Sequence, residues 1–318
     1  MTYNREWLTS NMNVKKRGYI MIKRLDELLE LAKVKVKKTL SVAVAQDNVV
    51  LKAVVEAVKL QIVDAILVGD EEKIREIATK ENLSLENIRI VNEKNIISAA
   101  AKAVELVTNG EAHFIMKGML GTSDLLKAVL NKEAGLRGKG LLSHVMVYDV
   151  PTYHKLLFLT DGGMVTSPEL KDKIEIINNA VEVAHALQID IPKVAPICAV
   201  EVVNPSMQAT LDAAALSLMN KRGQIKGCLI DGPLGLDNAI SKEAAEHKGI
   251  ISEVAGDSDI LLVPNIEAGN FLGKSLTYFA KAESAGIIVG AKCPVVLVSR
   301  ADSAKSKLYS IALGAVVV

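Results

Sequence analysis

The stretch Asp259–Ser306 reads DILLVPNIEAGNFLGKSLTYFAKAESAGIIVGAKCPVVLVSRADSAKS and contains the pattern that decides the fold. Two apolar runs within it, Ile260–Val263 and Val295–Val298, have the composition of strands that are covered on both faces. Polar residues follow each run, and in open α/β sheets ligands bind beyond the carboxyl ends of the strands. The stretch therefore predicts two strand ends at one ligand-binding crevice. The candidate ligand contacts are Asn265, Glu267 and Asn270 after the first run, and Ser299, Arg300 and Asp302 after the second.

The chain before this stretch alternates between apolar runs and helical patterns. The first runs, at 41–46, 65–70, 88–91 and 113–117, are each followed by an amphipathic segment, which predicts βαβ units and a parallel sheet. The next two runs are spaced as an antiparallel pair. They cover Val145–Val150 and Leu156–Asp161.

The segment Asn131–Leu142 is rich in glycine and charge and marks a domain boundary. We predict an α/β protein with two three-layer αβα domains, mostly parallel sheets and a cleft between the domains. The residues after 290 are too few for another unit, so they are expected to add to an existing sheet. The predicted division is a poorly ordered extension at 1–20, a first domain at 21–142 plus 290–318, and a second domain at 143–289.

Composition excludes several classes of function. The 38 Lys and Arg residues nearly balance the 37 Asp and Glu residues, which argues against a nucleic-acid surface. No apolar run is long enough to span a bilayer, so no membrane partner is expected. The three cysteines have no paired spacing, which favours the reducing cytoplasm. The five histidines show no metal-ligand spacing, so no metal is expected.

The sequence KGMLGTSDLLKAVL, which starts at Lys117, predicts a glycine-containing loop before a helix. Thr122 or Ser123 can cap that helix, and Gly118 and Gly121 can let the backbone approach a ligand. A helix N-terminus of this kind is a natural anion site. An ordinary glycine turn with a good cap explains the same residues equally well.

The segment Ala268–Ser275, AGNFLGKS, differs by one residue from the P-loop pattern. The pattern requires glycine where Ala268 stands, and Glu267 would face the phosphates with the wrong charge. We therefore predict a helix start here, with Asn270 near its cap and Lys274 in solvent, and no nucleotide hydrolysis.

The phrases PNIEAGN, AKAESAG and PVVLVSRADS resemble the phosphotransacylases, the phosphate acetyl- and butyryltransferases. The resemblance covers nearly the whole chain from about Met21, and SRADS and the short chain are most similar to the butyryl branch. It implies a two-domain fold like that of isocitrate and isopropylmalate dehydrogenases and acyl transfer between coenzyme A and phosphate. It also implies no permanently bound cofactor, coenzyme A as a substrate, and a homo-oligomer, dimer or larger.

The resemblance places Ser299 and Arg300 in the active site and Lys127 where the family has a substrate-binding arginine. The catalytic aspartate of the acetyl branch corresponds to Ser306, so Asp302 is the nearest carboxylate and the identity of the base stays open. A helix N-terminus capped by Asp302 or Ser303 is the structural alternative. The functional alternatives are a phosphate acetyltransferase and a non-catalytic α/β ligand-binding protein. A dehydrogenase would need a cluster of metal-binding aspartates, which the sequence lacks.

Overall fold

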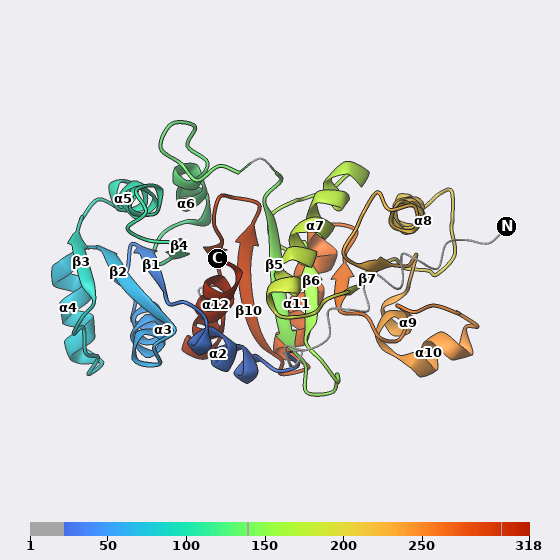
Figure 1. The fold of residues 1–318 in the computed structure, drawn as a ribbon, viewed down its shortest axis with the longest axis horizontal. Helices are drawn as coiled ribbons and strands as arrows, with labels where there is room; N and C mark the ends of the chain where they lie inside the picture. Colours follow the sequence, from blue (N-terminus) through green and yellow to red (C-terminus); the bar gives the residue numbers. More distant parts are fainter. Residues whose placement is uncertain (1–21, 139, 300) are drawn as a thin grey trace.

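The computed structural model describes residues 22–138, 140–299 and 301–318, and within them the strands form one 11-stranded sheet. The strand order is β3-β2-β1-β4-β11-β10-β5-β6-β9-β7-β8. Figure 1 shows the strands side by side along the long axis of the molecule, from β3 at one end toward β7 at the other. The strands are β1 (Lys38–Ala43), β2 (Val63–Gly69), β3 (Arg89–Asn92), β4 (Phe114–Lys117), β5 (Ser143–Asp149), β6 (Leu157–Thr160), β7 (Lys193–Pro196), β8 (Leu229–Ile230), β9 (Ile260–Leu262), β10 (Glu283–Val289) and β11 (Val295–Val296).

Most strand pairs are parallel, and the antiparallel ones lie in the middle of the sheet. Strand β10 pairs antiparallel with β11 and with β5, and β5 pairs antiparallel with β6. The mixed α/β class is therefore confirmed, as is the predicted antiparallel pair. The sheet is continuous because β10, a strand that the sequence analysis missed, hydrogen-bonds to both halves. The division into two domains stays a prediction, and the extension at 1–20 lies outside the described residues.

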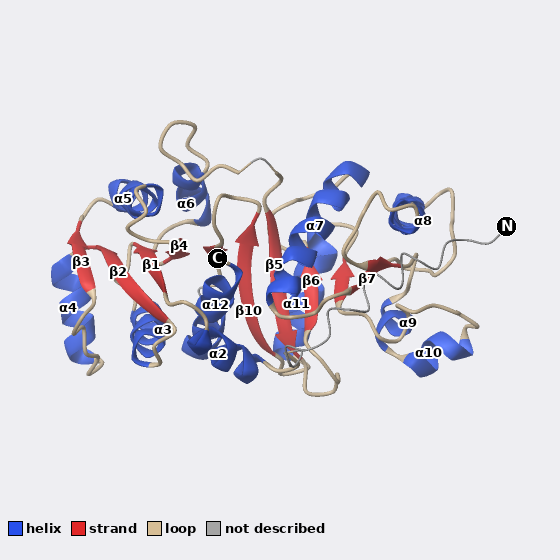
Figure 2. Cartoon of the chain, viewed as in Figure 1, coloured by secondary structure: helices blue, strands red, loops and turns tan. Residues whose placement is uncertain are grey.

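Helices surround the row of strands, as Figure 2 shows. Consecutive residues of β9 alternate between two apolar clusters on opposite faces, Ile260 and Leu262 in one and Leu261 in the other. Each face of a strand in such a sheet is covered by helices. The helices are α2 (Leu25–Val34), α3 (Asn48–Lys59), α4 (Glu71–Lys80), α5 (Ile96–Thr108), α6 (Thr122–Val129), α7 (Leu170–Ala186), α8 (Gln208–Lys221), α9 (Leu236–Ile240), α10 (Lys242–His247), α11 (Ile266–Tyr278) and α12 (Ala304–Val317).

Helix α12 is buried on all sides along most of its length, from Lys307 to Val316. It packs against α2, α3 and β10, and a Cβ at Gly314 would lie 2.8 Å from the Phe114 ring. The chain ends in three valines, which have low helix propensity. Burial against the sheet outweighs that propensity, so the helix continues to Val317.

Candidate active site

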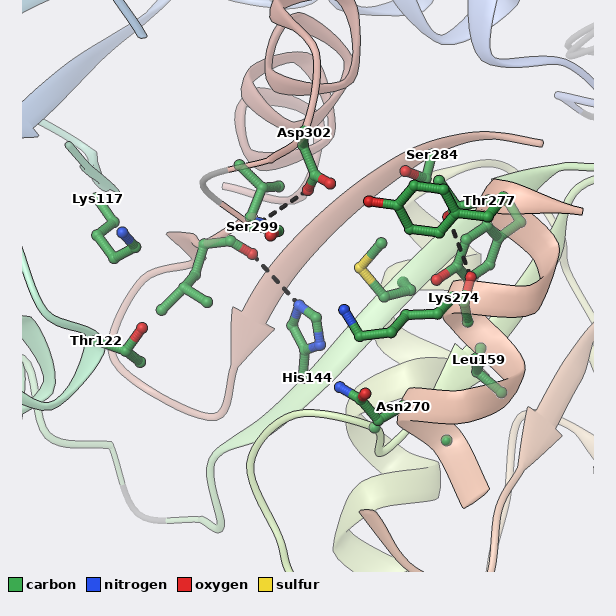
Figure 3. Close-up of a pocket in the computed structure, with 18 of the residues that line it drawn as sticks. Lys117, Thr122, His144, Leu159, Asn270, Lys274, Thr277, Ser284, Ser299 and Asp302 are labelled. Carbon is green, nitrogen blue, oxygen red and sulfur yellow. Dashed lines mark hydrogen bonds between the residues drawn. The ribbon is translucent and has the colours of Figure 1, made fainter. Parts of the chain in front are cut away.

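A cavity of about 260 Å³ lies where segments from distant parts of the chain meet. Its walls come from the end of β4, from β5, β6 and β10, from one face of α11 and from the loop between β11 and α12. In the view of Figure 3, Lys117 and Thr122 lie on one side, Asn270 and Lys274 on the other, and His144 between them. Its apolar lining consists of Leu120, Met146, Leu159, Leu297 and Val298.

Helix α11 lies close to the sheet because two of its residues are glycines. A Cβ at Gly269 would lie 2.6 Å from Gly162 Cα, and one at Gly273 would lie 2.5 Å from the Tyr148 hydroxyl oxygen. Real Cβ atoms do not approach neighbours so closely, so larger residues would push the helix away from the sheet. The close contact brings Asn270 and Lys274, four residues apart on one helix face, to the cavity wall.

The N-terminus of α11 corrects the sequence prediction. Its cap is Asn265, whose side chain accepts a hydrogen bond from the Ala268 N–H at 2.9 Å, so the prediction of a cap near Asn270 was wrong. The near-match to a P-loop lies entirely inside the helix, where its backbone N–H groups cannot surround a phosphate. The sequence could not show this, because asparagine is a good cap at either position.

The loop between β11 and α12 is held by a network of hydrogen bonds. The Ser299 N–H donates to Asp302 Oδ2 at 2.8 Å, and Lys307 Nζ donates to the carbonyls of Ser299 and Asp302 at 3.2 and 2.7 Å. Ser303, not Asp302, caps α12. Burial lowers the pKa of Lys307, and the charge of Asp302 offsets part of this effect. A buried lysine thus fixes the backbone that presents Ser299 and Asp302 to the cavity.

The loop after β4 approaches the cavity from the other side. Lys117, the last residue of β4, lines the cavity and donates to the carbonyls of Gly118 and Leu120 at 3.3 and 3.2 Å. A Cβ at Gly118 would lie 2.2 Å from the Val44 carbonyl oxygen, so close chain packing explains this glycine. Gly121 is the N-cap of α6, so the predicted cap at Thr122 or Ser123 was wrong. Thr122 is instead the first helical residue and lines the cavity.

The structure brings some of the predicted contacts together and separates others. The residues that line the cavity are Thr122, Asn270, Ser299 and Asp302, and those outside its lining are Gly118, Gly121, Ser123, Lys127, Asn265 and Glu267. The Lys127 side chain is 79% exposed and lies 3.6 Å from Asp124. Arg300 lies outside the described residues. The roles of all these residues stay predictions.

The two strand ends expected at one crevice lie at different sites. Strands β9 and β11 are separated by β10, β5 and β6, and Asn265 after β9 lines a second groove. That groove contains a buried ion pair in which Lys173 Nζ lies 2.6 Å from Asp212 Oδ2. Only the later part of α11, from Gly269 onward, contributes to the cavity next to Ser299. Strand order could not be read from the sequence, which left the distance between the two strand ends unknown.

Several polar residues of the cavity were missed, among them Lys117, Lys274 and His144. Lys117 is a charged residue that ends an apolar strand, which is a readable signal for the ligand-binding edge. Lys274 and Asn270 form a helical i, i+4 pair, which the comparison with a P-loop obscured. His144 lies in an alternating strand, where a histidine is difficult to distinguish from a core residue.

Comparisons with known proteins identify the family of the chain. A sequence profile described as phosphate acetyl/butaryl transferase matches residues 24–99 and 93–315. The phosphate butyryltransferase of Clostridium acetobutylicum is 56% identical over 297 residues, which cover 93% of this chain and 99% of that protein. A branched-chain phosphotransacylase from Enterococcus faecalis V583 superposes with a TM-score of 0.78 at 36% identity, covering 88% of this chain and 99% of that one.

A putative 4-hydroxythreonine-4-phosphate dehydrogenase from Salmonella typhimurium, 12% identical, has a TM-score of 0.56 and covers 89% of this chain and 100% of that one. This likeness concerns the fold alone and supports the expected dehydrogenase-like α/β architecture. The chain belongs to the phosphate acetyl/butaryl transferase family.

No helix in the described part of the chain is long and apolar enough to cross a membrane. Within the same part of the chain, no group of three or more His, Cys, Asp or Glu side chains is placed to hold a metal ion.

Proposed function

We propose that this chain catalyses the reversible reaction butanoyl-CoA + phosphate ⇌ butanoyl phosphate + CoA. The 56% identity to a phosphate butyryltransferase over 93% of the chain carries the proposal. The cavity supports it, because its lining offers polar groups for phosphate and apolar groups for the acyl chain. Lys117, Thr122, Lys274 and Ser299 offer positive charge and hydrogen bonds for phosphate, and the apolar lining accepts an acyl chain.

Positioning and electrostatics can account for the chemistry without a covalent enzyme intermediate, because an acyl phosphate is already activated. In our proposal Ser299 hydrogen-bonds the tetrahedral oxygen or the thiol, Arg300 binds phosphate, and Asp302 holds the loop that carries Ser299. Thr122 and Asn270 would contact the substrate from opposite walls. Lys127, Glu267 and Asn265 would contribute only if the substrate extends beyond the cavity.

A coupled assay tests the function directly. Butanoyl-CoA and inorganic phosphate are incubated with the purified chain, and free CoA is followed with a thiol reagent. Thiol release that requires phosphate identifies the transferase. Release without phosphate would indicate thioester hydrolysis, and tight binding without release would favour the non-catalytic alternative.

The choice of acyl group separates the butanoyl proposal from the acetyl alternative. A pocket discriminates by about 1–3 kcal/mol per methylene, so the two additional methylenes of butanoyl-CoA should raise kcat/KM about a hundredfold over acetyl-CoA. Equal kcat/KM values for the two donors would favour a phosphate acetyltransferase. Sedimentation of the active enzyme would test the expected homo-oligomer, dimer or larger.

Arg300 is tested by substitution, since its role rests on the sequence alone. Loss of one charge-assisted contact to phosphate costs about 1.5–3 kcal/mol, so Arg300→Ala should lower kcat/KM for phosphate roughly ten- to two-hundredfold. Arg300→Lys should recover only part of the lost kcat/KM, because the ammonium group of lysine lacks the planar, two-pronged geometry of a guanidinium. Arg222→Ala, an exposed arginine at the end of α8, is the matched control. An unchanged kcat/KM in Arg300→Ala would remove this residue from the phosphate site.

A further inference from the structure

A thiol reacts as its thiolate, so the proposed transfer from butanoyl phosphate to CoA needs a proton acceptor in the cavity. Lysine and tyrosine side chains are ordinarily protonated near neutral pH and cannot serve. Among the described residues that line the cavity, only His144 and Asp302 are of a type able to accept a proton. The inference below rests on the proposed function and names the residue that takes this proton.

Asp302 already has a structural task. Its Oδ2 accepts the Ser299 N–H, and its carbonyl accepts Lys307 Nζ, so the residue closes the turn after β11. A carboxyl group also ordinarily ionises near pH 4, far below a thiol. Proton transfer is most effective when the pKa of the base lies near the working pH, which favours an imidazole.

The position of the His144 ring is fixed by its backbone. The residue lies in β5, where its N–H donates to Asp161 Oδ2 at 3.2 Å and its carbonyl accepts Thr160 Oγ1 at 2.9 Å. The ring lines the cavity. In Figure 3 it lies between Thr122 on one side and Lys274 on the other. A group fixed in this way needs no rearrangement before it takes up a proton.

The contact with Leu297 determines which ring nitrogen carries the hydrogen. His144 Nε2 lies 3.3 Å from the Leu297 carbonyl oxygen, and a carbonyl oxygen can only accept. Nε2 is therefore the donor, and Nδ1 of the neutral ring keeps its lone pair. Within the part of the chain that the structure describes, no residue donates a hydrogen bond to Nδ1.

A glycine packs against the ring beside that lone pair. A Cβ at Gly163 would lie 2.7 Å from His144 Nδ1, so any other residue there would crowd the nitrogen. Gly162, the preceding residue, itself lines the cavity. The DGGM turn after β6 thus fixes the backbone of His144 through Asp161, and its glycine adds no side chain over Nδ1.

Burial lowers the pKa of His144 below its ordinary value, which keeps the ring neutral and able to accept a proton near pH 7. The charges of Asp161 and Asp302 and the Leu297 carbonyl offset part of this effect. Among the described residues, Lys117 on β4 and Lys274 on α11 are the cations that line the same cavity.

We propose that His144 is the general base of the transfer, accepting the CoA thiol proton at Nδ1. The sulfur lone pair then attacks the acyl carbon of butanoyl phosphate, and the carbon–oxygen bond to phosphate breaks. The departing phosphate takes the proton back from the imidazolium, so charge and atoms balance. In the opposite direction, neutral His144 takes the proton from phosphate as it attacks and returns it to the leaving thiolate.

The test is the pH dependence of kcat for butanoyl phosphate with CoA in wild type and in His144→Gln, whose amide can still donate to Leu297. Wild-type kcat should fall as pH drops through the lowered pKa of His144, which lies below the 6.5 of an ordinary imidazole. His144→Gln should lose about 10²- to 10⁴-fold in kcat near neutrality, with a small change in KM, and should regain activity at high pH as the thiol ionises by itself. His154→Gln is the matched control, because that ring is 58% exposed and bonds Asp257. It should behave as wild type.

Two outcomes overturn the proposal. One is wild-type kcat and pH dependence in His144→Gln. The other is a loss of activity that is equal at every pH, which indicates a structural role. His144→Asn is a second variant if His144→Gln does not fold. Absence of phosphate-dependent CoA release in wild type would instead refute the proposed function.

Discussion

Two lysines near the cavity differ in what their charges contact. Lys307 is buried and uses its charge on backbone carbonyls of the Ser299 loop. Lys274 is exposed at the cavity wall, where its charge is available to an anionic substrate. The sequence placed Lys274 in solvent and gave it no role. The structure changes that expectation, because a residue can be exposed and still face a ligand site.

Replacing Lys274 with alanine should weaken the binding of the anionic substrate. One charge-assisted contact is worth about 1.5–3 kcal/mol, so KM for phosphate or CoA should rise roughly ten- to two-hundredfold. Steady-state kinetics of Lys274→Ala measure the change in KM, and Lys281→Ala, beyond the end of the same helix, is the control. The melting temperature should stay the same, because an exposed side chain contributes little to stability. A wild-type KM for both substrates would exclude Lys274 from the site.

His144 should also leave a signature in stability. Because burial lowers its pKa in the folded state, the unfolded chain binds more protons between that lowered value and about 6.5. Stability should therefore fall as pH drops through this window, by at most about 1.4 kcal/mol per pH unit. Urea unfolding of wild type and His144→Gln from pH 8 to 5 would show the slope only in wild type. Parallel curves for the two proteins would contradict the lowered pKa.

At the scale of elements, α11 shows what a sequence can and cannot reveal. The sequence predicts both the helix and the strand before it. The observed strands Ile260–Leu262 and Val295–Val296 lie within the predicted apolar runs. Asn270 was predicted as a ligand contact and lines the cavity. The other residues of α11 that face the cavity could not be predicted, because that depends on how closely the helix approaches the sheet. Gly269 and Gly273 set this distance through contacts with Gly162 and Tyr148, which lie far away in sequence.

Gly269→Ala should destabilise the protein although alanine favours a helix by up to about 1 kcal/mol. The new methyl group would lie 2.6 Å from Gly162 Cα and 2.9 Å from a methyl group of Val263. Crowding of this kind costs about 1–3 kcal/mol, so we expect a net loss of about 1–2 kcal/mol in urea unfolding. Ser275→Ala, on the exposed face of α11, is the control and should be neutral or stabilising. A stable Gly269→Ala would mean that α11 can move away from the sheet at little cost.

At the scale of the whole molecule, the cavity exists only because the chain returns to its first half. The loop after β11 contributes Ser299 beside Lys117 because β11 pairs in parallel with β4. The return of the last segment to an existing sheet was predicted from the lack of room for another unit. The joining of both halves by β10 was not, because its Glu283–Gly286 start lacks the continuous apolar run of a buried strand. The proposed general base, His144, was also missed, because only tertiary contacts distinguish it from a core histidine.

A ligand that fills this cavity touches both halves of the sheet and should stabilise them together. Binding to the folded state alone adds about 2.7 kcal/mol at a ligand concentration of one hundred times Kd. For chains of 150–250 residues each kcal/mol raises Tm by roughly 2–4 °C, so CoA or butanoyl-CoA should shift a single transition upward by several degrees. Calorimetry with increasing CoA measures the shift, and Lys274→Ala should need a higher concentration for the same effect.

ATP is the control ligand for the P-loop pattern that the helix excludes, and it should be bound more weakly because it lacks the pantetheine thiol arm. A transition that divides into two on adding CoA, with only one part stabilised, would show that the ligand contacts one half of the sheet and that the cavity is not where CoA binds.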